Sequence, residues 1–142
     1  MGLFDSIGKA FSGDDTLTPR VAMTLAGISM IAADGEIEGE ELAAISALNA
    51  VTPDSYKRAL KLIKKTPTIG AIPEMVSEVL SEKQRLSVLF MLLDIAMSDG
   101  KLDGAEEALF QKYLAAFGIP ADAIKPAVSV LLIKNHPTLF NN

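Results

Sequence analysis

Cysteine is missing from all 142 residues, and histidine occurs only once, at His136. Without cysteine the chain forms no disulfide, thiolate metal site or thiol redox centre, and it suits a reducing compartment. The single histidine excludes histidine-metal motifs, and the sequence has neither a Gly-rich phosphate loop nor a nucleophile elbow. These absences predict a protein that is not an enzyme.

Positive charge is scarce as well, because 13 Lys and Arg residues stand against 18 Asp and Glu, for a net charge of −5. A nucleic-acid-binding protein needs a broad cationic face to neutralise phosphates. We therefore expect no nucleic-acid partner, and the composition favours cations or basic partners.

Long apolar runs are also lacking. The longest, residues 86–97, is interrupted by Asp94 and has about twelve residues, whereas a membrane span needs about twenty. The N-terminus lacks the cationic start and the long apolar stretch of a signal peptide. We expect a cytoplasmic protein in which residues 86–97 form a buried core helix.

Helical spacing of apolar residues is present throughout, and no segment alternates as a strand would. A chain of this length buries about 70% of its unfolded surface, so it needs no covalent cross-links. The sequence predicts an all-α fold, a bundle of about seven helices. Helix starts are expected at Thr18-Pro19, Thr52-Pro53, Pro73, Ser81 with Gln84, and near Pro126, and helix ends at Asp34-Gly35, before Pro67, at Asp99-Gly100 and at Gly118.

The chain repeats itself at an offset of 99 − 34 = 65 residues. Asp34, Gly35, Gly39 and Glu41 recur as Asp99, Gly100, Gly104 and Glu106. Each copy reads as helix, acidic turn, helix, and two such hairpins are expected to pack about a pseudo-twofold axis. One domain, 1–142, is expected to contain an amphipathic helix (1–14), a first repeat (18–50, second helix about 39–50), connecting helices (52–80), a second repeat (82–118, second helix about 104–117) and a C-terminal segment (119–142).

The acidic turns have an explanation that involves no ligand. Asp-Gly ends one helix, and an acidic residue three positions before a glutamate matches a capping box at the start of the next. Asp103 with Glu106 fits this pattern well, and Glu38 with Glu41 fits it less well, because Glu is a poor N-cap. The macrodipole also stabilises carboxylates near helix starts.

Capping uses only two acids per turn, and the turns contain more. They offer Asp34, Glu36, Glu38, Glu40 and Glu41 in the first copy, and Asp99, Asp103, Glu106 and Glu107 in the second. Counted from Asp34, the acids and Gly39 reproduce the first half of an EF-hand loop, but Ile45 and Phe110 stand where the bidentate glutamate belongs. An oxygen-rich turn of this kind binds Ca²⁺ or Mg²⁺ with water completing the shell, with weak affinity, on the order of 10⁻⁴ to 10⁻³ M. Capping and metal binding both remain open from the spacing.

At these residues the sequence resembles the TerB-like family of tellurite-resistance proteins. The resemblance rests on AADGEIEGEE (32–41) and MSDGKLDGAEE (97–107), each after a helix end of small residues, and on the opening MGLFDSIGKAFSG. It covers about residues 1–118, and residues 119–142 depart from the ending typical of the family.

The resemblance implies an all-helical fold of two related halves and divalent-cation binding by the acidic turns. By motif match it carries over Asp34, Glu40 and Glu41 in the first turn, and Asp99, Asp103 and Glu106 in the second. Lys101 stands where the first turn has Glu36, so we expect a weaker second site. The resemblance also implies a stress-response role with a protein partner, in an assembly at the inner face of the bacterial membrane.

An amphipathic N-terminal segment offers another surface. Leu3, Phe4, Ile7 and Phe11 lie on one face of the expected helix, which either folds back on the core or lies on a membrane or partner. Only Lys9 is basic before Arg20, so strong direct membrane binding is not expected.

Two features lie in the expected helices themselves. Asp94 is expected to reach the bundle edge or a hydrogen bond, and otherwise to serve as a further ligand. A basic helix face is either solvated or a dock for an acidic protein or phosphate; it consists of Lys57, Arg58, Lys61, Lys64 and Lys65.

Overall fold

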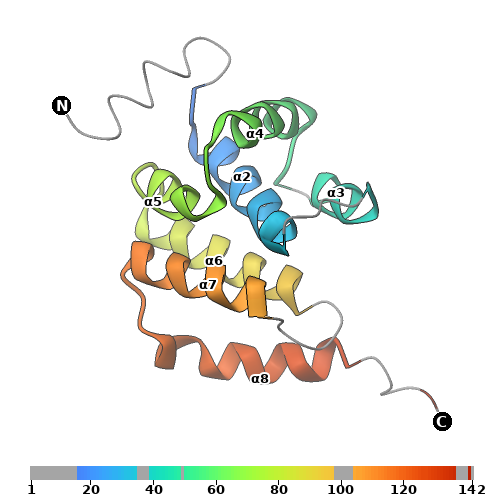
Figure 1. Ribbon diagram of the computed structural model, residues 1–142. Helices are drawn as coiled ribbons and strands as arrows, with labels where there is room; N and C mark the ends of the chain where they lie inside the picture. Colours follow the sequence, from blue (N-terminus) through green and yellow to red (C-terminus); the bar gives the residue numbers. More distant parts are fainter. Residues whose placement is uncertain (1–15, 35–38, 49, 98–103, 137–140, 142) are drawn as a thin grey trace.

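The computed structural model describes residues 16–34, 39–48, 50–97, 104–136 and 141, and these contain helices and no strand. The expected all-α fold is thereby confirmed. With the labels of Figure 1, the α-helices are α2 (Pro19–Ile31), α3 (Gly39–Ser46), α4 (Pro53–Lys65), α5 (Ile72–Ser77), α6 (Glu82–Ala96), α7 (Gly104–Phe117) and α8 (Lys125–Lys134). Short 3₁₀ turns are η2 (Ala32–Asp34), η3 (Ile69–Ala71) and η4 (Ala121–Ile124). The predicted helix over 1–14 lies outside the described residues.

Local capping fixes three of the helix starts where the sequence predicts them. The backbone N–H of Val21 donates to Thr18 Oγ1 (3.2 Å) at the start of α2. Capping boxes open α4 and α6: Ser55 N donates to Thr52 Oγ1 (3.0 Å), and Ser81 N donates to Gln84 Oε1 (2.8 Å). Each satisfies backbone N–H groups that have no partner inside the helix.

Helix α2 lies at the centre of the bundle, packed against α4, α5 and α6, with α3 at its end (Figure 1). Helix α7 packs on α5 and α6, and α8 runs along α6. Gly27 permits the close approach of α2 to α3, because a Cβ there would lie 3.0 Å from Ile45 Cδ1. The buried core includes Leu25, Ile28, Leu89, Leu92 and Phe110.

The two repeats share the order helix, turn, helix, but their second helices differ in length. Helix α7 has 14 residues, as expected, whereas α3 has 8 and ends at Ser46 instead of near Ala50. A turn follows in which Val51 N donates to Leu48 O (3.0 Å). Beyond this turn Thr52 is extended, because the residue before a proline disfavours helical geometry, and Pro53 begins α4. The pseudo-twofold relation and the expected domain subdivisions remain predictions.

Among the described residues no single helix has the length and apolar character needed to cross a membrane. The helix pair Gly104–Phe117 and Ala121–Lys134 passes such a test only when taken together, and it is bent by 111°.

Candidate functional site

The first acidic turn begins where α2 reaches the buried core. The backbone N–H of Ala32 bonds to Ile28 O and Met30 O, and Ile31 and Ala32 are both buried. The backbone of Asp34 then completes η2, and those of Glu40 and Glu41 lie in the first turn of α3. The side chains of these three acids, and all of Glu36 and Glu38, lie outside what the structure describes.

The second acidic turn has a similar frame. Met97 is buried, and its backbone N–H donates to Leu93 O (2.9 Å) as α6 ends. Helix α7 begins at Gly104, with Glu106 and Glu107 in its first turn. Glu106 is half-buried and has an interaction partner, whereas Glu107 is exposed. The other two predicted ligands, Asp99 and Asp103, lie outside the described part of the chain.

The helix ends that flank both turns lie on the same side of the bundle. The C-terminal ends of α2 and α6 and the N-terminal end of α7 point the same way in Figure 1. The η2 turn also packs against α7, and α2 packs against α6. The two acidic segments are therefore attached to neighbouring elements.

A buried hydrogen bond ties the two repeats together. Ser29 on α2 and Tyr113 on α7 are both fully buried, and their hydroxyl oxygens lie 2.6 Å apart. Ser29 Oγ also donates to Ala26 O (2.6 Å) in its own helix, and the Tyr113 ring packs edge-on against Phe117. Burial raises the pKa of Tyr113 far above its usual range, although its hydrogen bond with Ser29 partly opposes the rise. The phenol is therefore a structural group and stays protonated.

Asp94 meets the expectation of a hydrogen bond. Its carboxylate accepts from Lys134 Nζ at 2.9 Å and from Asn135 Nδ2 at 3.1 Å, both at the C-terminal end of α8. Burial alone would raise its pKa, but the bonds from Lys134 and Asn135 and the lysine charge hold that pKa below its usual value. Asp94 therefore holds α8 against α6.

The metal-ligand assignment stays a prediction, because Glu106 is the one residue of the eight whose side chain the structure describes. Within those ranges, no three acidic or histidine side chains are grouped to hold a metal ion. Sequence reasoning missed the Ser29–Tyr113 bond, since no local pattern links positions in different repeats.

A family model described as "Tellurite resistance protein TerB" matches residues 20–127. No curated protein and no solved structure matched the chain. The matched span begins in α2 and ends in α8, so it includes both helix–turn–helix repeats and both acidic segments. Because this span is more than half of the chain, the protein belongs to the TerB family.

Proposed function

We propose that this TerB-family protein is a non-enzymatic stress-response protein that binds Ca²⁺ or Mg²⁺ weakly through its two acidic turns. The observation that carries the proposal is the repeated acidic Asp-Gly turn, attached in both copies to helix ends on one side of the bundle. Carboxylate oxygens are the ligands that both cations prefer. The proposed ligands are those named from the sequence: Asp34, Glu36, Glu38, Glu40, Glu41, Asp99, Asp103 and Glu106.

Weak affinity follows from the position of these acids. The turns lead into the N-termini of α3 and α7, where the helix dipole favours carboxylates but opposes a cation. Some carboxylate oxygens also accept from backbone N–H groups when they cap, which removes lone pairs from the metal. A cation site here needs water ligands and millimolar metal.

Tellurite itself is a poor ligand for this chain. It is an anion, the chain has a net charge of −5, and without cysteine it has no thiol with which to reduce the oxyanion. We infer that protection is indirect, through a protein partner in an assembly at the inner face of the membrane, with this protein on the cytoplasmic side.

Replacement of the first aspartate of each turn by asparagine tests the cation site. Asn suits turn positions nearly as well as Asp, so Asp34→Asn with Asp99→Asn preserves the turns and removes two charges. Calorimetric titration of chelated protein is expected to show cation binding that the double variant loses. By linkage, wild-type protein should gain about 2.7 kcal/mol of stability at a hundred times the dissociation constant.

Asp103→Ala separates the two roles proposed for that residue. Without metal it removes a cap, so we expect a loss of about 1 kcal/mol. Because Asp103 is also a proposed ligand, added cation should stabilise this variant less than wild type. Equal melting of wild type and the Asp34→Asn, Asp99→Asn variant across a millimolar Ca²⁺ and Mg²⁺ series would refute cation binding.

The second candidate function is an adaptor module whose acidic turns are only helix caps and which works by binding a protein partner. It is favoured by large apolar side chains exposed on α6 and α8: Leu86, Phe90, Val130, Leu132 and Ile133. On this interpretation, Phe90→Ser with Ile133→Ser abolishes tellurite protection in cells, and Asp34→Asn with Asp99→Asn leaves it intact. The opposite pattern supports the cation site.

A further inference from the structure

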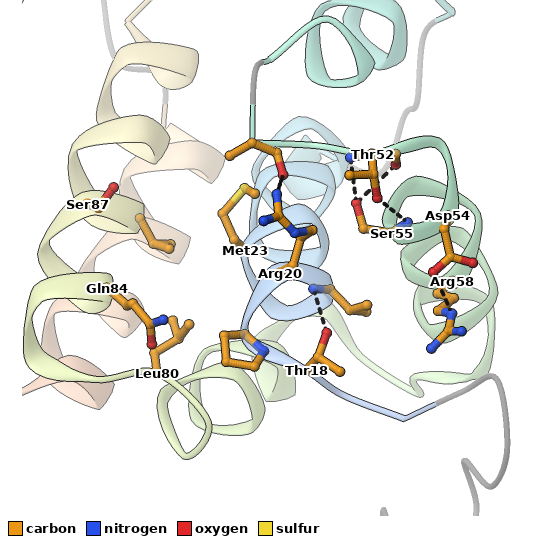
Figure 2. Close-up of a pocket in the computed structure, with 14 residues that line it drawn as sticks. Thr18, Arg20, Met23, Thr52, Asp54, Ser55, Arg58, Leu80, Gln84 and Ser87 are labelled. Carbon is orange, nitrogen blue, oxygen red and sulfur yellow. Dashed lines mark hydrogen bonds and ion pairs between the residues drawn. The ribbon is translucent and has the colours of Figure 1, made fainter.

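A groove of about 560 Å³ lies across the start of α2, at the opposite end of that helix from the η2 turn. Figure 2 shows Arg20 near its middle, with Leu80, Gln84 and Ser87 on one side and the start of α4 on the other. Apolar side chains of α2, α6 and the segment before α6 line it: Val21, Met23, Leu80 and Val88. Its other surfaces are rich in hydrogen-bond donors.

Arg20 is held in place by one hydrogen bond and keeps further N–H donors for a ligand. Its Nη1 donates to Ala50 O (2.6 Å), which fixes the guanidinium against the loop before α4. A guanidinium has five N–H donors, and in the described part of the chain this is its one hydrogen bond. Gln84 adds an amide: its Oε1 accepts from Ser81 N, which leaves its NH₂ group to face the groove.

The charged residues of the groove give it a net positive charge, which favours an anionic ligand. Arg20 and Arg58 contribute two positive charges and Asp54 one negative charge, which leaves a net positive charge in a chain of −5. Arg58 Nε lies 3.0 Å from Asp54 Oδ2, and the Asp54 side chain is 71% exposed. The Asp54 carboxylate of this pair faces water, which screens the pair, whereas the Arg58 side chain is only 27% exposed. Arg58 therefore contributes its positive charge to the groove.

Cations continue from the groove along α4. Residues at helical spacing from Asp54 are Arg58, Lys61 and Lys65, so these side chains form one stripe that leads away from the groove. Lys61 and Lys65 are exposed. A ligand that follows this stripe has to be extended and to carry several negative charges.

We propose that this groove binds an acidic, extended segment of a partner protein. One ligand carboxylate bonds to Arg20, a neighbouring apolar side chain packs on Met23 and Leu80, and further carboxylates follow the basic stripe of α4. A single small anion uses Arg20 alone and leaves the apolar floor and the stripe unused. The inference names the partner chemistry for the proposed function and rests on it for the existence of a protein partner, but it does not require cation binding.

Fluorescence anisotropy with metal-free, full-length protein tests the groove. The probe is a labelled short peptide that alternates glutamate with leucine, and its matched control has glutamine in place of glutamate. We expect saturable binding of the acidic peptide that weakens as salt screens the charges, and no binding of the control. Arg20→Gln should weaken binding about tenfold, because it removes a charge-assisted hydrogen bond.

Two further variants keep the result interpretable if Arg20→Gln disturbs the Ala50 loop. Ser87→Glu removes no described bond and places a carboxylate at the groove, so we expect it also to weaken binding about tenfold. Lys125→Gln removes a charge on α8, which lies across the bundle from α4 in Figure 1, and should leave binding unchanged.

Equal binding by wild type and Ser87→Glu would overturn the proposal, as would equal binding of the two peptides. Displacement of the peptide by acetate at the same carboxylate concentration would identify a small-anion site and would also overturn it. Cation binding is measured separately by calorimetry. A failure of peptide binding therefore does not refute cation binding, and a failure of cation binding does not refute the groove proposal.

Discussion

The buried hydrogen bond between Ser29 and Tyr113 predicts that substitutions of its two partners have different costs in the free energy of unfolding. Ser29 has one hydroxyl proton, which it donates to Ala26 O, so Tyr113 must donate its own proton to Ser29 Oγ. Tyr113→Phe removes the donor and leaves Ser29 bonded within its helix. Ser29→Ala leaves the phenol O–H in the core with its described partner gone.

The magnitudes follow from that asymmetry. Both side chains are fully buried, so water does not replace the lost partner. Ser29→Ala should cost about 1–3 kcal/mol, the penalty of an unsatisfied buried donor, and Tyr113→Phe about 0.5–1.5 kcal/mol. The double variant should cost less than Ser29→Ala alone, because it leaves no orphaned hydroxyl.

Urea unfolding followed by circular dichroism gives the free energies, and an unchanged m-value shows that the unfolded state is comparable. Ser46→Ala is a matched control: Ser46 Oγ donates to Ala43 O (2.9 Å) as Ser29 does to Ala26 O, but Ser46 is exposed. We expect a change within about 0.5 kcal/mol there. Strictly additive costs, or a larger cost for Tyr113→Phe than for Ser29→Ala, would contradict the argument.

Two other predictions concern single positions. Gly118 has φ of 70°, so Gly118→Ala should cost about 1–2 kcal/mol in thermal unfolding, whereas Gly104→Ala, at a position without positive φ, should not destabilise. Asp94→Asn should lower the melting temperature at neutral pH. Because the folded-state pKa of Asp94 is depressed, its contribution is present above about pH 4, the usual pKa of an aspartate, and is lost as pH falls through the lower folded-state pKa, where the stabilities of wild type and variant should converge. Equal pH dependence of the two would refute this.

The helix starts were predictable because the chemistry that fixes them is local. Thr18 with Pro19, Thr52 with Pro53, and Ser81 with Gln84 each satisfy their own helix N-terminus within four residues. The early end of α3 was harder to place. Its apolar pattern continues past Ser46 to Leu48, so periodicity alone does not mark the end of the helix.

Contacts between distant segments were not predictable in the same way. The sequence predicted that Asp94 reaches the bundle edge or a hydrogen bond, but it did not identify the partner, because Lys134 lies 40 residues away in a helix whose packing has no local signal. The same reason explains why Ser29 and Tyr113 were missed, since they are 84 residues apart. Periodicity assigns a residue to the core but does not say which residue it meets there.

The acidic turns were predictable in their local structure but not in their contacts. Their sequence predicts where the helices break, and the offset of 65 predicts that the breaks are equivalent. Five acids fall within residues 34–41, and like charges so close together destabilise the folded chain unless something neutralises them. Capping and the helix dipole stabilise only those acids that reach the first turn of α3. In the proposed function, the remaining negative charge is what attracts a divalent cation, and the second turn, where Lys101 stands in place of Glu36, has less of that charge.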